Sequence, residues 1–264
     1  MLMHIQIKNN QSGVAHVGVI LLVVAVLAVI GFVGYNVMNK EEADNNQSQQ
    51  TSQTTTQTSA DEADIALQNF GLRSLDSVLV SEDAVREYSS KQLKGFYVFG
   101  DKLSGGRINP NFEFASLKSD TEVVAAIDGV IGFIKEQPDS GDMEVFLQPK
   151  EGSAWTIGYD HLTDVAVKKG DSVKAGDVLG KPAKQGNGAL RFEIQINKDK
   201  NGDTQHVCPS TLLASDVSAS LLKDLADMQK SWETTTGLDL YNLETQDPTG
   251  CLKKSMTPSE AEGS

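Results

Sequence analysis

Histidine and cysteine are the side chains that most often bind zinc, and this chain has few of either. It has four histidines and two cysteines in 264 residues. Two cysteines are too few for a zinc site of four cysteines, but they suffice for one disulfide. A metal site of His161, His206 and Glu113 is conceivable, but nothing in the spacing brings His206 to His161. We therefore do not expect a zinc site built from these three residues.

Residues 199–203 (Asp-Lys-Asn-Gly-Asp) carry acidic and amide side chains of the kind that bind calcium. An EF-hand loop has glycine at its sixth position and glutamate at its twelfth, and this segment has neither. Because Asn201 and Gly202 are adjacent, a hairpin turn is the better interpretation.

The overall charge restricts the partners of the chain. Asp and Glu outnumber Lys and Arg by 36 to 23, which gives a formal net charge of −13. Nucleic-acid affinity comes mainly from Lys and Arg that neutralise phosphates, so we expect no nucleic-acid partner. The length and the 39% of hydrophobic residues allow one or two domains with a real core, which argues against a disulfide miniprotein or a fully disordered chain.

The apolar residues are concentrated near the start of the chain. No charged residue lies between Lys8 and Lys40, and residues 17–35 are almost entirely apolar. A helix crosses a bilayer with about 20 apolar residues, whereas the apolar part of a cleaved signal peptide has only about 7–15. We therefore expect an uncleaved transmembrane anchor at residues 13–38, after a tail at residues 1–12.

A polar segment follows this anchor. Residues 39–62 are rich in Ser, Thr, Gln and Asn, and they have too few apolar side chains to offset the entropy of an ordered backbone. They are interpreted as a disordered linker. Since the preceding tail is short and both cysteines lie beyond the linker, we expect a single-pass membrane protein. Its amino end would be cytoplasmic and its bulk extracytoplasmic.

Beyond the linker, short apolar runs alternate with Gly, Asp and Pro. Residues 121–127 and 130–135 are rich in β-forming side chains and are joined by Asp-Gly, which predicts a hairpin. Further strands are predicted at residues 143–148, 154–159, 172–179 and 190–196. This spacing is typical of an all-β sandwich or barrel, here placed at residues 63–210.

A glycine-aspartate pair occurs twice, six residues apart. Gly170-Asp171 and Gly176-Asp177 each predict a tight turn in which glycine adopts positive φ. The pattern resembles the hammerhead of biotinyl and lipoyl carrier domains and of barrel-sandwich hybrids in general. The lysine motifs of the carriers are absent, so the resemblance concerns architecture alone.

Residues 211–264 carry a helix and the second cysteine. Val217, Leu221, Leu225, Met228 and Trp232 have helical spacing, and Ser215 or Asp216 is able to cap such a helix. A second helix start is predicted at residues 81–85. In an oxidising compartment, a Cys208–Cys251 disulfide would hold this segment on the β domain and contribute on the order of 3–4 kcal/mol. Two free thiols are the alternative.

Four sequence blocks within residues 96–209 resemble the lysostaphin-type zinc metallopeptidases. In chain order they are Glu-Val-Val-Ala-Ala-Ile-Asp-Gly-Val-Ile (122–131), Tyr-Asp-His-Leu (159–162), the glycine-aspartate repeat, and Leu-Arg-Phe-Glu-Ile (190–194). The resemblance implies a mainly β barrel-sandwich hybrid, the duplicated hybrid motif. It also implies relatives that cleave peptide cross-links in bacterial peptidoglycan.

The same resemblance implies that the metal site is degenerate. It places Asn109 and Glu113 at the first pair of zinc ligands, and Ala189 and Arg191 at the His-x-His motif. Of the two catalytic histidines of the family, only His161 is retained. A catalytic zinc needs three protein ligands, and arginine cannot ligate because it stays protonated. We therefore expect no cofactor and no metal ligands, with zinc only if a divergent site exists.

Arg191 is the residue that we expect to replace the metal. Strand alternation puts the apolar residues of 190–196 on one face and Arg191 on the other. Our hypothesis is that its guanidinium pairs with Glu113 in a bidentate contact, and a solvated surface charge is the alternative. Asn109, Glu113, Arg191 and Tyr159 are the predicted binding residues, with His161 the doubtful catalytic one.

Three functions are compatible with these features. The first is a non-catalytic, membrane-anchored domain that binds peptidoglycan peptides or regulates an envelope hydrolase. The second is a divergent zinc metalloendopeptidase, and the third is a structural domain that contacts another protein through its acidic surface or its carboxy-terminal helix.

Overall fold

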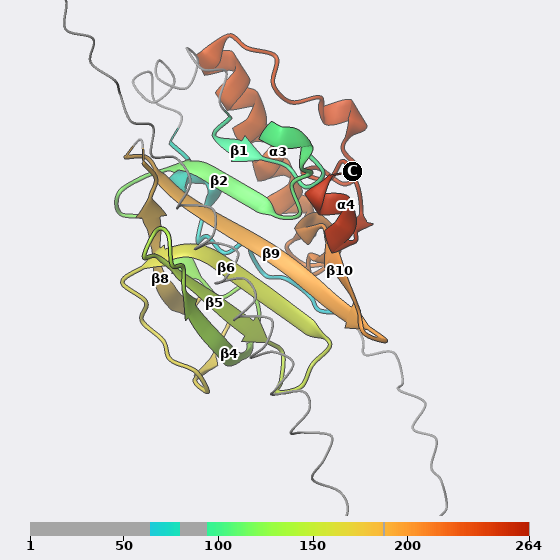
Figure 1. Ribbon diagram of the computed structural model, residues 1–264. Helices are drawn as coiled ribbons and strands as arrows, with labels where there is room; N and C mark the ends of the chain where they lie inside the picture. The colour runs from blue at the N-terminus through green and yellow to red at the C-terminus, as the bar shows by residue number, and fades with distance from the viewer. Residues whose placement is uncertain (1–63, 80–93, 187, 264) are drawn as a thin grey trace, which may run out of the picture. The chain divides into compact units, whose positions relative to one another are not determined.

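Short antiparallel strands dominate the fold, as the spacing of the apolar runs predicts. A computed structural model describes residues 64–79, 94–186 and 188–263, and in these ranges the strands join in the order β1-β2-β9-β8-β6-β5-β4-β7 (Figure 1). Off this path, β3 pairs with β8, β10 with β9 and β11, and β6 also with β9.

The strands have the following bounds: β1 (Phe96–Tyr97), β2 (Phe112–Leu117), β3 (Val123–Val124), β4 (Gly129–Glu136), β5 (Met143–Gln148), β6 (Trp155–Thr163), β7 (Ser172–Val173), β8 (Val178–Lys184), β9 (Leu190–Lys200), β10 (Asp203–Val207) and β11 (Ser255–Met256). The helices are α3 (Ser218–Thr236) and α4 (Pro258–Glu262), with 3-10 turns η1 (Leu75–Ser77), η2 (Ser104–Gly106), η3 (Pro209–Leu212) and η4 (Leu243–Thr245). The prediction of a mainly β domain is therefore confirmed.

Strand β9 is the longest strand of the sheet, and it lies between β2 and β6 (Figure 1). Its Phe192, Ile194 and Ile196 are completely buried, while Arg191, Glu193 and Gln195 alternate with them. Because side chains point alternately to the two faces of a strand, one face of β9 builds the core and the other carries polar groups. Each buried side chain of this size contributes about 1.5–3 kcal/mol, which fixes the register of the whole strand.

The predicted Asp128-Gly129 hairpin is wrong. β3 pairs with β8, whereas β4 pairs with β5 and β7. Asp128 instead accepts hydrogen bonds from the backbone N–H of Ala175, at 2.9 Å, and from Lys174 Nζ, at 2.7 Å. Gly129 is needed because a Cβ there would lie 2.3 Å from the carbonyl oxygen of Gln148.

Both glycine-aspartate turns form as predicted. Gly170 has φ +89° and Gly176 has φ +90°, in the left-handed region that favours glycine. Asp171 and Asp177 each accept a hydrogen bond from the backbone N–H three residues earlier. The second turn divides residues 172–179 into β7 and β8, so the single strand predicted there is wrong.

The turn between β9 and β10 is also the predicted hairpin. Asn201 has φ +54° and Gly202 has φ +88°, so the Asn-Gly pair turns the chain with positive φ at both residues. His206 lies on β10, and its Nδ1 contacts Asn197 Oδ1 at 2.7 Å. His206 therefore belongs to a different part of the sheet from His161.

Helix α3 lies beside β1, at the end of the sheet opposite β4 (Figure 1). Leu225, Met228 and Trp232 are buried as their spacing predicts. The predicted cap at Ser215 or Asp216 is wrong, because Val217 is the N-cap and makes no side-chain capping bond.

The predicted disulfide between Cys208 and Cys251 is present. Both cysteines are buried, and Cys208 precedes η3 while Cys251 follows η4. Tyr241, Met256 and Ala261 also join the core that the sheet builds. The carboxy-terminal segment thus packs on the same core as the strands.

Several predictions concern residues outside the described ranges. The tail, the anchor at residues 13–38, the linker at residues 39–62 and the helix start at residues 81–85 all lie there. Among the described residues, no helix combines the length and the apolar character that a membrane crossing requires.

Candidate functional site

Neighbouring strands place carboxylates side by side on the polar face of the sheet. Glu113 on β2 is paired with Glu193 on β9, and Glu193 is also near Asp160 on β6, because Asp160 and Glu193 are Cα partners. On β5, Glu144 lies where the register with β6 shifts. Gln137 Nε2 bridges Asp160 and Glu144: it donates to Asp160 Oδ1 at 3.2 Å and to Glu144 Oε2 at 3.4 Å. We call Glu113, Glu144, Asp160 and Glu193 the acidic row.

Arg191 extends into this row from β9. Its NH2 lies 2.9 Å from Glu193 Oε1, and its NH1 lies 3.6 Å from Glu113 Oε1. The Arg191 side chain is 28% exposed and both glutamates are 13% exposed, so Arg191 is not a solvated surface charge. The pairing with Glu113 is present, but it is a single long contact and not the bidentate one that the sequence suggested. The closer partner is Glu193.

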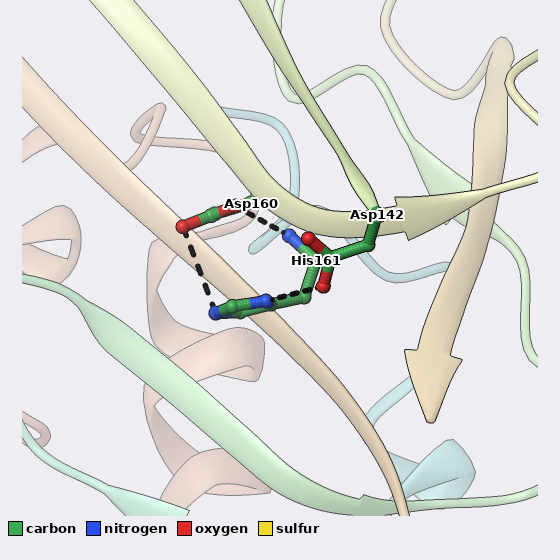
Figure 2. A group of neighbouring side chains, drawn as sticks. All are labelled: Asp142, Asp160 and His161. Atoms are coloured by element: carbon green, nitrogen blue, oxygen red, sulfur yellow. Dashed lines mark hydrogen bonds and ion pairs between the residues drawn. The ribbon is translucent and has the colours of Figure 1, made fainter. Parts of the chain in front are cut away.

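His161 lies at the same place, near the end of β6. Figure 2 shows its ring between Asp142 and Asp160: Nδ1 lies 2.7 Å from Asp142 Oδ2, and Nε2 lies 3.6 Å from Asp160 Oδ2. The backbone N–H of His161 donates to Asp160 Oδ1 at 2.7 Å. This bond accompanies a φ of +61°, which is uncommon for a residue other than glycine. The ring also contacts Arg191 NH2 through Nε2.

The surroundings strongly shift the pKa values of Glu113, Glu144 and His161. Burial, then the charge of Asp160, raises the pKa of Glu144 to about 7. Burial, then the charge of Glu193, raises the pKa of Glu113 to about 7, although Arg191 and His161 act in the opposite direction. Burial lowers the pKa of His161, but hydrogen bonding and charge attraction from Glu193, followed by Asp142, outweigh it and raise that pKa to about 9. His161 is therefore mainly protonated at neutral pH.

Arg191 and His161 share Glu193 as an acceptor. Glu193 Oε1 lies 3.4 Å from His161 Nε2 and 2.9 Å from Arg191 NH2. A protonated imidazole donates from both nitrogens, so the direct contact between Arg191 and His161 belongs to the neutral ring. When His161 is protonated, Glu193 is the group that holds the two cations together.

Two of the predicted binding residues are buried. Asn109 is 1% exposed, and its Nδ2 donates to the backbone carbonyls of Tyr97, Val98 and Asn111. Tyr159 is 0% exposed, and its hydroxyl accepts from the backbone N–H of Ala126 at 2.7 Å. Burial argues against direct ligand contact for both residues, which instead hold the backbone around the site.

Four residues of the site were not predicted. They are Asp142, Glu144, Asp160 and Glu193. Strand alternation predicts that Glu193 shares a face with Arg191, which is a signal that could have identified it. Asp160 stands next to His161 in the sequence, but Asp142 and Glu144 reach the site through the pairing of β5 with β6.

The residues present do not fit a catalytic zinc. Among the described residues, Asp142, Asp160 and His161 offer ligand atoms that lie within 4.8 Å of one another. However, Nδ1 of His161 is bonded to Asp142, and its Nε2 faces the Arg191 guanidinium. Arginine is always charged, so it repels a cation at this position and cannot ligate one.

Asp142 also lines a cavity of 440 Å³. It is lined by polar and charged groups that include Ser140, Thr163, Lys181 and Lys184. Lys181 Nζ lies 3.2 Å from Asp164 Oδ2, in a pair that is mostly exposed. Of the site residues, Asp142 is the one that lines this cavity.

Residues 113–204 match the sequence model of Peptidase family M23. The match begins at Glu113 and contains both His161 and Arg191, while Asn109 lies outside it. The predicted resemblance to lysostaphin-type metallopeptidases is thus confirmed for this segment. A comparison with curated proteins finds no match to the chain.

Solved structures of such peptidases are similar to part of the chain. Lysostaphin from Staphylococcus simulans is 24% identical over 39% of this chain and 42% of its own, with a TM-score of 0.33. The catalytic domain of a prophage-encoded M23 protein from Enterococcus faecalis is 24% identical over 43% of this chain and 88% of its own, with a TM-score of 0.34. A zinc-containing peptidase from Vibrio cholerae is 22% identical over 39% and 32%, with a TM-score of 0.32. The chain thus spans less than half the length of intact lysostaphin.

Proposed function

We propose that this chain, whose residues 113–204 form a domain of the M23 peptidase type, is a non-catalytic module that binds cell-envelope peptidoglycan or regulates an envelope hydrolase. One observation carries the proposal. The guanidinium of Arg191 lies among Glu113, Glu193 and His161, where the family resemblance puts a metal ligand.

Catalysis would need two things that this site does not supply. A metallopeptidase polarises the scissile carbonyl and activates a water with its metal, and Arg191 provides a fixed cation that has no ligand exchange. A general base must be unprotonated at the working pH, whereas His161 has a pKa of about 9. The retained histidine is therefore a hydrogen-bond donor and a poor proton acceptor.

Binding needs only groups that hydrogen-bond a ligand, and the site has many. The acidic row accepts hydrogen bonds from peptide N–H and ammonium groups, while Arg191 and His161 donate to carbonyl or carboxylate oxygens. The side chains of Glu113, Glu193, His161 and Arg191 are 13–28% exposed. They are thus partly desolvated, which strengthens polar contacts with a ligand.

The proposed location is extracytoplasmic, with the chain anchored by one membrane helix at residues 13–38. The apolar run at residues 17–35 supports the anchor. The buried Cys208–Cys251 disulfide supports an oxidising compartment, since disulfides rarely persist in the cytosol.

A divergent zinc metalloendopeptidase that cleaves peptidoglycan cross-links is the second candidate. The observation in its favour is the group of Asp142, Asp160 and His161, whose ligand atoms converge within 4.8 Å. For this candidate, the Arg191 side chain would have to move away from His161, because its positive charge would repel a bound metal ion.

Sedimentation with insoluble peptidoglycan separates the two candidates. The full chain is kept in a neutral detergent, incubated with peptidoglycan with and without a chelator, and centrifuged, and released peptides are measured in the supernatant. We expect co-sedimentation that the chelator does not change, with no release of peptides. Chelator-sensitive release would support the enzyme. Absence of both binding and release would refute peptidoglycan binding and peptidoglycan cleavage, and would favour a role through a protein partner.

Arg191→Met, with Arg73→Met as its matched control, locates the binding site. Arg73 pairs with Glu122 at 2.8 Å on the exposed surface, so this control removes the same charge elsewhere. We expect Arg191→Met to weaken co-sedimentation and Arg73→Met to leave it unchanged. If Arg191→Met co-sediments as well as Arg73→Met does, the peptidoglycan contact lies outside the site.

A further inference from the structure

A part of the polar sheet face next to the acidic row carries no charge at neutral pH. Two rows of side chains cross the strands here. The first is Phe133, Phe146, Gly158 and Gln195, and the second is Val130, Gln148, Thr156, Asn197 and His206. We call these nine residues the neutral strip. They come from β4, β5, β6, β9 and β10, so the strip spans five adjacent strands, or about 19 Å at ordinary strand spacing.

The pairing register places the strip on the same face as the acidic row. Gly158 and Gln195 are Cα partners, and so are Asp160, two residues later on β6, and Glu193, two residues earlier on β9. Because residues two apart in a strand share a face, the strip continues directly into the acidic row. A ligand that lies across one can therefore reach the other.

An exposed aromatic pair marks one end of the strip. Phe133 is 48% exposed and is one of two large hydrophobic side chains exposed in the described part of the chain, the other being Leu252. The rings of Phe133 and Phe146 stack with centroids 4.8 Å apart and planes 19° apart. Gly158 lies beside Phe146, since a Cβ at Gly158 would be 3.6 Å from the Phe146 ring. Phe133 is thus the member of the pair that presents apolar surface to solvent, supported by the half-buried Phe146.

Amide and hydroxyl groups form the rest of the strip. Gln148 donates to Thr156 at 3.4 Å, Asn197 donates to Gln195 at 3.4 Å, and His206 Nδ1 contacts Asn197 Oδ1 at 2.7 Å. Burial lowers the pKa of His206, so its ring is neutral at pH 7. These half-buried groups are held in place and still have donors and acceptors to share.

The chemistry of the strip excludes several partners. A nucleic acid would be repelled by the neighbouring carboxylates. An extended peptide cannot add as a strand, because the interior strands already use their backbone groups in the sheet. One exposed aromatic pair is too small an apolar area for a stable protein or membrane contact. An uncharged ligand with apolar C–H surfaces and many hydroxyl or amide groups fits best.

We propose that the neutral strip binds a saccharide chain, with one sugar stacked on Phe133 and the following sugars hydrogen-bonded to Gln148, Gln195 and Asn197. This inference rests on the proposed function, since it assigns the glycan part of an envelope ligand to the strip and leaves the peptide part to the acidic row.

Titration with a tetramer of β-1,4-linked N-acetylglucosamine tests the proposal. The full chain is kept in a polyoxyethylene detergent, which has no sugar headgroup, and binding is measured by calorimetry and by ligand-observed NMR. We expect saturable binding by the unchanged protein. Phe133→Ala should weaken it by roughly 3- to 10-fold, the range expected for loss of one aromatic contact.

Leu252→Ala is the matched control, because Leu252 is 40% exposed and lies outside the strip. It removes a comparable exposed apolar group and should leave the saccharide affinity unchanged. Phe133→Leu keeps an apolar side chain but loses the ring face, so it should bind about as weakly as Phe133→Ala. Phe133 is at the surface, and unchanged thermal unfolding of each variant verifies that the fold is retained.

Each outcome has a defined meaning. Tetrasaccharide binding that Phe133→Ala weakens and Leu252→Ala does not supports the proposal. Failure to bind the tetrasaccharide by a protein that still co-sediments with peptidoglycan overturns the saccharide inference and leaves the proposed function intact. Failure of both measurements overturns the saccharide inference together with the peptidoglycan-binding form of the proposed function. Equal binding by the unchanged protein and Phe133→Ala also refutes the assignment to the strip.

Discussion

Arg191→Met tests the electrostatic structure of the site most sharply. Methionine keeps the apolar part of the arginine side chain but removes its charge. Glu193 then loses its contact at 2.9 Å and Glu113 its contact at 3.6 Å, and both carboxylates are 13% exposed. The variant therefore leaves two nearly buried acids, with His161 still 3.4 Å from Glu193 and Arg107 still acting on Glu113.

The size of the effect follows from this burial. Removing one partner of a buried ion pair costs about 3–5 kcal/mol, whereas exposed pairs contribute about 0–1 kcal/mol. Since Arg191 is 28% exposed, we expect a loss of about 2–3 kcal/mol in the free energy of unfolding at pH 8. Near pH 5 Glu113 can take up a proton, so the loss should fall to about 1 kcal/mol.

Urea unfolding followed by tryptophan fluorescence provides the assay. The chain has two tryptophans, Trp155 and Trp232, and they are 1% and 0% exposed, so both report on the folded domain. Arg73→Met serves as the control and should cost less than about 1 kcal/mol, because its pair is exposed. If Arg191→Met lowers the free energy of unfolding at pH 8 no more than Arg73→Met does, the conclusion that Arg191 stabilises the buried carboxylates of the site is refuted.

Three further predictions concern stability. The unchanged protein should lose roughly 5 kcal/mol or more between pH 5 and pH 9 in urea titrations, because the folded state raises the pKa of Glu113 and Glu144 from 4.5 to about 7 and of His161 from 6.5 to about 9, so it binds more protons than the unfolded chain. Constant stability over this range would contradict the pKa assignments. Gly95→Ala should cost about 1–3 kcal/mol in the same assay, since a Cβ at Gly95 would lie 2.3 Å from the Trp232 ring; a neutral substitution would show that α3 can shift. Reduction of the disulfide, which closes a loop with a sequence separation of 43, should cost about 4 kcal/mol, and an unchanged urea midpoint after reduction would contradict this.

The sequence predicts β9 and its faces well because the strand has one fully buried side. Phe192, Ile194 and Ile196 alternate with polar residues, and this period has one structural interpretation. The same holds for the turns at Gly170, Gly176 and Asn201, since positive φ restricts the residue types that fit.

The site is harder to predict because it is assembled across strands. Asp142 reaches His161 only through a shift in the β5–β6 register between Met143 and Val145. No local pattern encodes that shift. The Asp128-Gly129 turn fails for a similar reason: Asp128 bonds to Lys174 and Ala175, distant in sequence, instead of closing a hairpin.

Titration of the full chain with zinc tests the account most directly. The family resemblance puts a metal ligand at the position of Arg191, and the guanidinium lies against Glu193 and His161. On the proposed function we therefore predict no stoichiometric zinc in the purified protein and no saturable zinc binding in the micromolar range, while binding to peptidoglycan persists. One equivalent of tightly bound zinc, together with release of peptides from peptidoglycan that a chelator abolishes, would contradict it.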